Sequence, residues 1–377
     1  MSDTGSCFAV KLDASGARLL YSTRLAGVSN LGAIALDGEG QLIIAGSSLD
    51  PRLPVTPGAI QTESDLPGFE GAVLKLGANG DTVVFATYLG GSGDDWINGL
   101  SLDSDGNIHL AGFSTSIDFP YTEGALDTRP ASKPKGFSDA FVAKIDPLGT
   151  SLIYAARPSG SCHDVPFALA VDPNGRAIIT GWTCSPDLPV TAGAVQSRNE
   201  PGSMVAFATV LSAGGEAIEY STYLGGSLSS GGFSVLVDDQ QRIVITGGTT
   251  NPDLATTPDA PARCNSLLGG DFLVRLDLRH PENRFTTYVD GISVLIPGSG
   301  DQILGAGLDH ITAVDPRPLS GLSIQCVAND ASGFSDFIAP QELVTVYGSD
   351  LGRAGLAPAA PALARRFALR AEPGRLR

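Results

Sequence analysis

Three aspartates recur at one position of a repeating pattern in this chain, and such carboxylates could bind cations. Each follows by six positions the glycine near the end of an apolar run, and the three residues are Asp118, Asp187 and Asp253. A ring of such carboxylates could hold cations, whereas a repeated aspartate more commonly accepts hydrogen bonds from backbone N–H groups of its own loop. Both interpretations are open, and we expect the second.

An aromatic side chain beside two carboxylates is a second candidate site. Asp94, Asp95 and Trp96 occur together in one copy of the repeat only, and Trp182 lies just after another apolar run. An indole ring next to polar groups could contact a sugar or a peptide, but a tryptophan can equally pack between neighbouring parts of a core. These four residues and the three recurring aspartates are our candidate binding residues.

Two of the five cysteines are placed to form a disulfide. Cys162 precedes one predicted strand and Cys184 follows its predicted neighbour, so antiparallel pairing would bring the two within disulfide range. We predict this bridge, with two unpaired small side chains as the alternative, and we expect Cys7, Cys264 and Cys326 to be unpaired. A bridge would indicate an oxidising compartment. Because no CxxC pair or Cys/His ligand spacing is present, we expect no zinc site.

The sequence shows no motif for catalysis. Residues 103–107 (DSDGN) resemble part of a calcium loop but lack its Gly-x5-Glu continuation, and Asp-Gly is typical of a hairpin turn. The four histidines fall at unrelated positions of the repeat, and no GxSxG elbow lies between a strand and a helix. We therefore predict no catalytic residue, no metal site and no cofactor.

The elements that must position the candidate residues come from one repeated unit. Five segments align without gaps, at 7–27, 71–91, 140–160, 206–226 and 271–291. Each of the first four is followed by a second module, at 32–46, 98–112, 168–181 and 233–247. Segment and module each consist of two apolar runs around a turn, as in a β-hairpin. Four strands per period predict an all-β fold, a β-propeller of four-stranded antiparallel blades.

The long connections of these blades are the predicted binding surface. In a four-stranded antiparallel blade the tight hairpin turns lie at one face, and the longer connections lie at the other. Loops held on a rigid scaffold commonly carry binding residues. We expect any binding site on the face of the long connections 53–61, 119–127 and 188–196.

The repeat resembles a known family. AFVAKID (140–146), YSTYLGG (220–226) and LPVTPGA (53–59) are similar to the bacterial β-propeller repeat called SBBP, which occurs in large secreted proteins of mostly unassigned activity. The resemblance covers roughly residues 7–291 and implies no catalytic residue. Residues 323–352 resemble the opening of an immunoglobulin-like C-terminal domain, of which only the first strands would be present.

The phase of the repeat suggests how a ring could close. The chain opens with a half-blade at 8–25 and ends its repeats with another at 292–307. Pairing of strand 302–307 with strand 8–12 would give about five blades with one split closing blade and no free sheet edge. The alternative is a fragment of a larger ring. We expect the propeller to occupy 1–314, followed at 315–377 by a linker, the incomplete immunoglobulin-like segment and a disordered tail.

Composition limits the partners. The 377 residues carry 40 acidic and 24 basic side chains, a net charge of −16, and no basic patch for nucleic acid. No apolar run is long enough to span a membrane. No signal peptide is readable at the start, so we expect the chain to begin inside a longer protein. With the resemblance, this predicts a monomer outside a bacterial cell or on its surface.

The functional prediction is a non-catalytic binding or structural module that presents its long loops to a protein, a glycan or a surface. The alternative is a propeller enzyme, a lyase or a hydrolase, with its site on the same face. Such an enzyme needs titratable groups that converge in one pocket with shifted pKa values. A binding module would instead show scattered carboxylates.

Overall fold

The structure, a computed structural model, describes residues 7–64, 68–226, 228–251, 253–258, 260 and 270–289, with the strands 294–297, 303–306, 311–314, 323–329, 344–349 and 365–367. The described residues form strands and a single-turn 3-10 helix, Pro281–Asn283, so the predicted all-β class is confirmed. Among them, no helix is long and apolar enough to cross a membrane. The chain divides into two compact units, Met1–Tyr223 and Leu224–Arg377.

The first unit holds one hairpin and three four-stranded antiparallel sheets. The hairpin is β1 (Phe8–Leu12) and β2 (Leu19–Arg24). Blade I is β3 (Asn30–Leu36), β4 (Leu42–Ser48), β5 (Glu70–Leu76) and β6 (Val83–Leu89). Blade II is β7 (Asp95–Leu102), β8 (Ile108–Ser114), β9 (Asp139–Ile145) and β10 (Leu152–Ala156). Blade III is β11 (Asp164–Val171), β12 (Ala177–Thr183), β13 (Val205–Leu211) and β14 (Ile218–Leu224).

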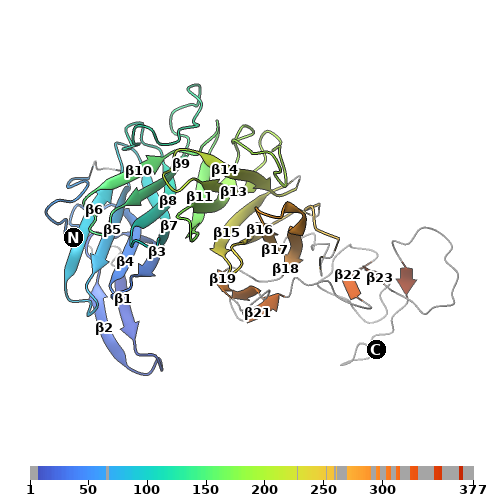
Figure 1. Ribbon diagram of the computed structural model, residues 1–377, viewed down its shortest axis with the longest axis horizontal. Coiled ribbons are helices and arrows are strands. Elements are labelled where there is room, and N and C mark those ends of the chain that lie inside the picture. Colours follow the sequence, from blue (N-terminus) through green and yellow to red (C-terminus); the bar gives the residue numbers. More distant parts are fainter. Residues whose placement is uncertain are drawn as a thin grey trace. The chain divides into compact units, whose positions relative to one another are not determined.

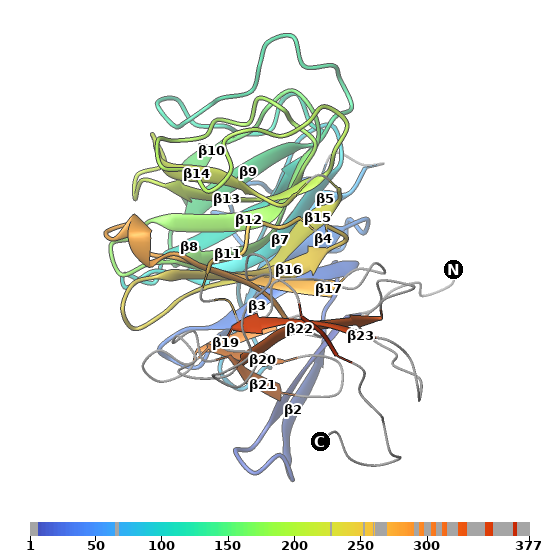
Figure 2. The same ribbon diagram turned by 90° about the vertical axis from the view of Figure 1, so that its right-hand side faces the viewer.

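Apolar faces join successive blades of the first unit (Figure 1). Ile43 and Val73 of blade I share one buried cluster with Phe141 of blade II. A second cluster joins Val142 of blade II to Phe207 of blade III. Burying apolar side chains between sheets is the main favourable contribution to such a fold. Blade II therefore packs against both blade I and blade III (Figure 2).

Aspartates shape the tight turns between the first two strands of each blade. In blade II, Asp103 Oδ1 accepts hydrogen bonds from the backbone N–H groups of Asp105 at 3.0 Å and Asn107 at 2.9 Å. Gly106 takes a positive φ of 79° there, which glycine adopts without strain. The turn interpretation of residues 103–107 is therefore confirmed. In the corresponding turn of the second unit the residue with positive φ is Gln241, at 60°.

The opposite end of the blades carries the longer segments and is called the long-loop side below. It contains the connections from each second strand to the third, at 49–69, 115–138 and 184–204, and the links 90–94 and 157–163 that lead into the next blade. The first strand of a blade begins at this side and its second strand ends there. Every candidate binding residue of the first unit lies at or near this side.

The second unit contains a further four-stranded sheet and two three-stranded sheets. Blade IV is β15 (Ser230–Val237), β16 (Ile243–Thr249), β17 (Gly270–Leu276) and β18 (Phe285–Val289). The next sheet is β19 (Val294–Pro297), β20 (Ile303–Ala306) and β21 (Ile311–Val314). The last is β22 (Ser323–Asn329), β23 (Val344–Ser349) and β24 (Arg365–Phe367).

The predicted pairing of strand 302–307 with strand 8–12 in a closing blade is wrong. β20 lies between β19 and β21, so both of its edges are occupied, while β1 pairs with β2 in a two-stranded sheet. The count of about five blades is accordingly not confirmed. Phe8 and Leu12 of β1 are 69% and 51% exposed. At the equivalent positions of β5, Ala72 and Leu76 are covered because β1 and β2 pack against them.

The immunoglobulin-like domain expected after residue 323 is not shown. β22 and β23 lie within residues 323–352, the segment that resembles the opening of such a domain. β24 adds a third strand in the tail, where no strand was predicted, by pairing with β23. The division of the chain at residue 314 stays a prediction.

Candidate functional site on the long-loop side

The recurring aspartates hold the links between blades. Asp118 Oδ1 accepts hydrogen bonds from the backbone N–H of Ser92 at 2.9 Å and from its hydroxyl at 2.8 Å. Asp187 Oδ1 makes the same two contacts with Ser161, both at 2.8 Å. The bonds from Ser92 lower the pKa of Asp118. Each aspartate thus fixes the link 26 residues before it. We had expected it to accept hydrogen bonds from its own loop.

Asp253 occupies the same place in the second unit. A methyl group added at Gly226 would lie 2.0 Å from Asp253 Oδ1, so this carboxylate faces the backbone of the link into blade IV. The three aspartates therefore share a position in their repeats and an orientation toward a link. Their binding of a ligand stays a prediction.

Buried aspartates begin two of the blades. Asp95 Oδ2 accepts hydrogen bonds from the N–H of Gly91 at 2.8 Å and from the hydroxyl of Ser116 at 2.7 Å. Asp164 is the equivalent residue of blade III and accepts the N–H of Gly160 at 2.8 Å. Burial raises the pKa of both carboxyl groups. These groups bind backbone of the links and lie below the protein surface.

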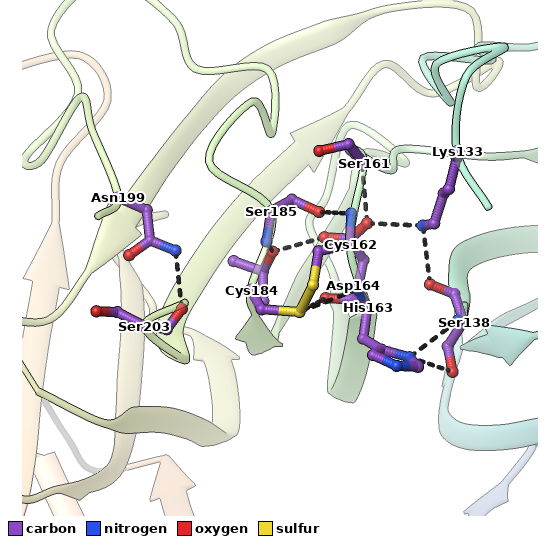
Figure 3. Close-up of a disulfide and its surroundings, with 12 residues drawn as sticks. Lys133, Ser138, Ser161, Cys162, His163, Asp164, Cys184, Ser185, Asn199 and Ser203 are labelled. Carbon is purple, nitrogen blue, oxygen red and sulfur yellow. Dashed lines mark hydrogen bonds and ion pairs between the residues drawn. A yellow bond between two sulfur atoms is a disulfide. The ribbon is translucent and has the colours of Figure 1, made fainter. Parts of the chain in front are cut away.

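A buried lysine next to Asp164 was missed by the sequence analysis (Figure 3). Lys133 Nζ lies 2.6 Å from Asp139 Oδ1 and 3.3 Å from Asp164 Oδ2, and it donates a hydrogen bond to the Ser138 carbonyl at 3.0 Å. Its side chain is completely buried. One signal could have pointed to it, because the repeat spacing across this loop is 69 residues instead of 64 to 66.

Two arginines add positive charge beside the buried Lys133 and its acidic partners. Arg129 Nε lies 2.7 Å from Asp139 Oδ2, and Arg157 forms an ion pair with Asp127. The Arg157 guanidinium also stacks 4.3 Å from the centre of the Tyr121 ring, a favourable cation–π geometry. The basic side chains are therefore engaged with acidic partners or an aromatic ring.

The predicted disulfide is confirmed. Cys162 and Cys184 are bonded, with their Cα atoms 5.4 Å apart. The bridge joins the link before β11 to the residue after β12, and the Cys162 N–H donates to Ser185 Oγ at 2.9 Å (Figure 3). Cys7 is free as expected. Cys264 and the side chain of Cys326 lie outside the part of the chain that the structure describes.

Half-buried aromatic side chains form two clusters on the long-loop side, one at blade II and one at blade III. In the first, the Trp96 ring lies 4.3 Å from Phe69 and 6.0 Å from Phe113, measured between ring centres. Exposed Asp94 supports this cluster by accepting the Phe69 N–H at 2.9 Å. The predicted group is thus divided, since Asp94 and Trp96 share the cluster with Phe69 while Asp95 points into the blade.

The second aromatic cluster lies beside the disulfide. The His163 ring lies 4.6 Å from Phe137 and 6.2 Å from Trp182, measured between ring centres, and is tilted against both. Trp182 stands where Phe113 stands in blade II, and both immediately precede the last residue of a second strand. Both tryptophans were predicted from the sequence but their aromatic partners were not, because these partners come from separate strands and loops.

A buried histidine lies at the opposite, tight-turn end of blade II. His109 Nε2 is 3.2 Å from Asp103 Oδ2, and Lys144 Nζ is 2.9 Å from the same oxygen. Burial lowers the pKa of His109, which favours the neutral ring. Among the described residues, no group of three or more His, Cys, Asp or Glu side chains is arranged to hold a metal ion.

Solved structures similar to this chain include three of different kinds. A protein of unknown function from Dyadobacter fermentans DSM 18053 is 14% identical over 86% of this chain and 93% of that chain, with a TM-score of 0.43. Pyrococcus horikoshii acylaminoacyl peptidase is 10% identical over 90% and 46%, with a TM-score of 0.37. A europium-containing methanol dehydrogenase is 11% identical over 92% and 70%, with a TM-score of 0.40.

One part of the chain matches a family model. No curated protein matches it. Residues 84–120 match the model described as SBBP, a β-propeller repeat. This stretch contains most of β6, the link 90–94, and both β7 and β8. The segment that carries Asp94, Asp95, Trp96 and Asp118 is therefore similar to an SBBP β-propeller repeat.

Proposed function

We propose that this chain is a non-catalytic binding or structural module of an extracellular bacterial protein, and that its long-loop side presents aromatic clusters to a glycan or protein ligand. The observation that carries the proposal is the pair of half-buried clusters on the long-loop side, around Trp96 in blade II and Trp182 in blade III. Aromatic rings bury a large apolar area while keeping a polar edge available, which suits sugars and peptide side chains. The disulfide supports an oxidising compartment.

The titratable groups near these clusters support a role without catalysis. Asp95 and Asp118 accept hydrogen bonds from link residues, and Lys133 is enclosed between Asp139 and Asp164. A general acid or base must reach a substrate proton. Groups engaged in holding backbone are poorly placed for that task, so we propose a scaffold and no active site.

Retention of the protein by polysaccharides tests the proposal. Soluble neutral and acidic polysaccharides are cast into native gels, and migration of the wild type is compared with that of Trp96→Ala and Trp182→Ala. Leu148→Ala is the matched control, because Leu148 is 65% exposed in a tight turn at the opposite end. We expect at least one polysaccharide to retard the wild type and the control, with retardation weakened by each tryptophan substitution. Retardation unaffected by both substitutions would contradict the proposal.

A further inference from the structure

Two equivalent joints between blades of the first unit are closed by the same backbone contact with different acceptors. At each joint the donor is the N–H of the residue before a third strand. The Phe69 N–H donates to Asp94 Oδ1 at 2.9 Å, and the Ser138 N–H donates to His163 Nδ1 at 3.0 Å. Asp94 and His163 each immediately precede the first strand of the next blade. The joint of blades II and III therefore uses an imidazole where the joint of blades I and II uses a carboxyl group.

The two acceptors respond differently to protons. A carboxyl group keeps an accepting oxygen in either protonation state, whereas an imidazolium carries hydrogens on both ring nitrogens and accepts at neither. Because His163 Nδ1 accepts the Ser138 N–H, the neutral ring carries its hydrogen on Nε2, and protonation adds the second one at Nδ1. Two hydrogens would then face each other across 3.0 Å, so the imidazolium cannot keep this contact. The equivalent contact of Asp94 meets no such conflict.

Ser138 is anchored on its carboxyl side. Its carbonyl accepts hydrogen bonds from Lys133 Nζ at 3.0 Å and from the Asp164 N–H at 3.1 Å. Its hydroxyl lies 3.2 Å from His163 Nδ1 and could accept from an imidazolium, but the backbone N–H beside it could not (Figure 3). The peptide group that joins Ser138 to Phe137 is therefore the part of this joint that is left to move.

Residues 134–137, called the flap below, lead into Ser138 at the protein surface. The first three are exposed, and a methyl group added at Gly136 would meet nothing within 4 Å. Phe137 is half-buried, with its ring centre 4.6 Å from that of His163. Ser138 itself is buried, so an N–H that loses the imidazole regains a partner only when water reaches it. Opening of the flap would admit that water.

Charged groups face the His163 ring from two elements, the loop before β9 and β11. They are Lys133 and Asp164, which form an ion pair at 3.3 Å. Burial lowers the pKa of His163, Lys133 lowers it as well, and Asp164 opposes them. The neighbouring strand β12, AIITGWT, contributes the Trp182 ring and has no charged residue. The ring is therefore neutral at pH 7, and the imidazolium forms below about pH 6.5.

We propose that the contact between His163 and the Ser138 N–H is a pH-sensitive switch, which holds the flap closed when the imidazole is neutral and releases it when the imidazole is protonated. Phe137 then leaves the His163 ring, and the aromatic cluster around Trp182 opens. The cluster around Trp96 keeps its aspartate contact and does not respond. The switch follows from the geometry of the joint and does not depend on the proposed function.

The switch has a consequence for binding, which rests on the proposed function. A cluster that is held in one arrangement binds more tightly than one that must first be ordered. A ligand of the long-loop side would therefore be bound at both clusters at neutral pH, and mainly at the cluster around Trp96 in acid.

Hydrogen exchange of the Ser138 amide tests the switch without any ligand. Exchange is followed by mass spectrometry of overlapping peptic fragments from pH 7.5 to 4.5, and each rate is divided by the intrinsic rate at that pH. We expect the protection factor of Ser138 to fall about tenfold per pH unit once His163 titrates, since one proton opens the contact. The Phe69 amide should keep its protection. The amide of Val142, in the buried strand β9, reports any general loss of stability.

Exchanging the two acceptors provides the matched variants. His163→Asp should keep Ser138 protected over the whole pH range. Asp94→His, at an exposed residue, should transfer the pH dependence to the Phe69 amide. Ser138→Ala removes the hydroxyl but not the backbone N–H, and should leave the pH dependence of residue 138 in place. If His163→Asp does not fold, Asp94→His carries the test.

Three results would overturn the switch. They are a Ser138 protection factor that follows that of Val142 at every pH, a decline that persists in His163→Asp, and a Phe69 amide that stays insensitive to pH in Asp94→His. Binding is tested separately, by gel retardation of Trp96→Ala at pH 7.5 and 5 with a polysaccharide that retards the wild type. We expect weaker retardation in acid. Absence of retardation at both pH values in every variant and in the wild type would contradict the proposed function, while the exchange result decides the switch.

Discussion

Asp118 and Asp187 each accept two hydrogen bonds from one serine, and this contact explains why a surface aspartate recurs in the repeat. A carboxylate that receives a backbone N–H and a hydroxyl together fixes the position of a link between two blades. Asp95 and Asp164 bind the same links from below the surface. The residues most suggestive of chemistry in the sequence therefore act first on the backbone.

His109 should make stability depend on pH. Its folded-state pKa is lowered, mainly by burial, so the neutral ring is favoured when the chain is folded and unfolding takes up a proton below about pH 6.5. Stability should therefore fall as the pH decreases from 7.5 to 5. Asp103, Lys144 and the edge of the Tyr154 ring are the neighbours that face this imidazole.

The measurement is chemical denaturation at several pH values. His109→Ile introduces the isoleucine that blades I and III have at the equivalent positions, Ile43 and Ile178. The variant should reduce the slope of unfolding free energy against pH by up to about 1.4 kcal/mol per pH unit. A remaining slope is expected from His163, whose pKa is also lowered by burial. An identical slope in wild type and variant would contradict this role of His109.

Gln241 adopts a backbone conformation that glycine adopts elsewhere. Its φ is 60°, while Gly106 and Gly175 in the corresponding turns have φ of 79°. Gln241→Gly should raise the free energy of unfolding by about 0.5–1 kcal/mol, because the left-handed region costs more for a residue with a Cβ than glycine loses in entropy.

Denaturant unfolding measures this effect, and Gly106→Ala provides the opposite case. A Cβ at Gly106 would meet Pro147 at an ordinary 3.7 Å, so the change introduces conformational strain without a clash. We expect it to lower stability by about 1 kcal/mol. A loss of stability in Gln241→Gly would contradict the turn argument.

At the scale of elements, the sequence predicted the strands of the blades because each carries its own periodic signal. The disulfide followed from the same pattern, since two strand ends meet at one side of a blade. The pairing of β20 did not follow, because strands of several repeats carry similar apolar patterns and local sequence does not select among them. Lys133 was not predicted because its partners lie on strands that begin six and 31 residues later.

The disulfide should stabilise blade III and its link. It closes a segment of 22 residues, for which the chain-entropy model gives about 3 kcal/mol. Cys162→Ser with Cys184→Ser should lower the free energy of unfolding by that amount, and Cys7→Ser, at the free cysteine, should change it little. Equal stability of the wild type with and without a reducing agent would show that the bridge contributes nothing.

At the scale of the whole molecule, the repeat places equivalent groups at the same end of successive blades. In the first unit this brings the aromatic clusters around Trp96 and Trp182 to the long-loop side, together with the exposed carboxylates of Asp94 and Asp118. The net charge of −16 favours neutral or cationic partners over polyanions. A repeated surface of this kind fits a ligand with more than one contact point, such as a polysaccharide.

The central claim is binding without turnover, and one time course tests it directly. A polysaccharide that retards the protein in gels is incubated with an excess of the wild type. New reducing ends and unsaturated products are measured over time. Binding is followed in the same samples by the fluorescence of Trp96 and Trp182, the two tryptophans of the chain. We predict saturable fluorescence change with no increase of either product over a sample without protein. Product that accumulates in proportion to protein concentration would contradict the account and identify an enzyme.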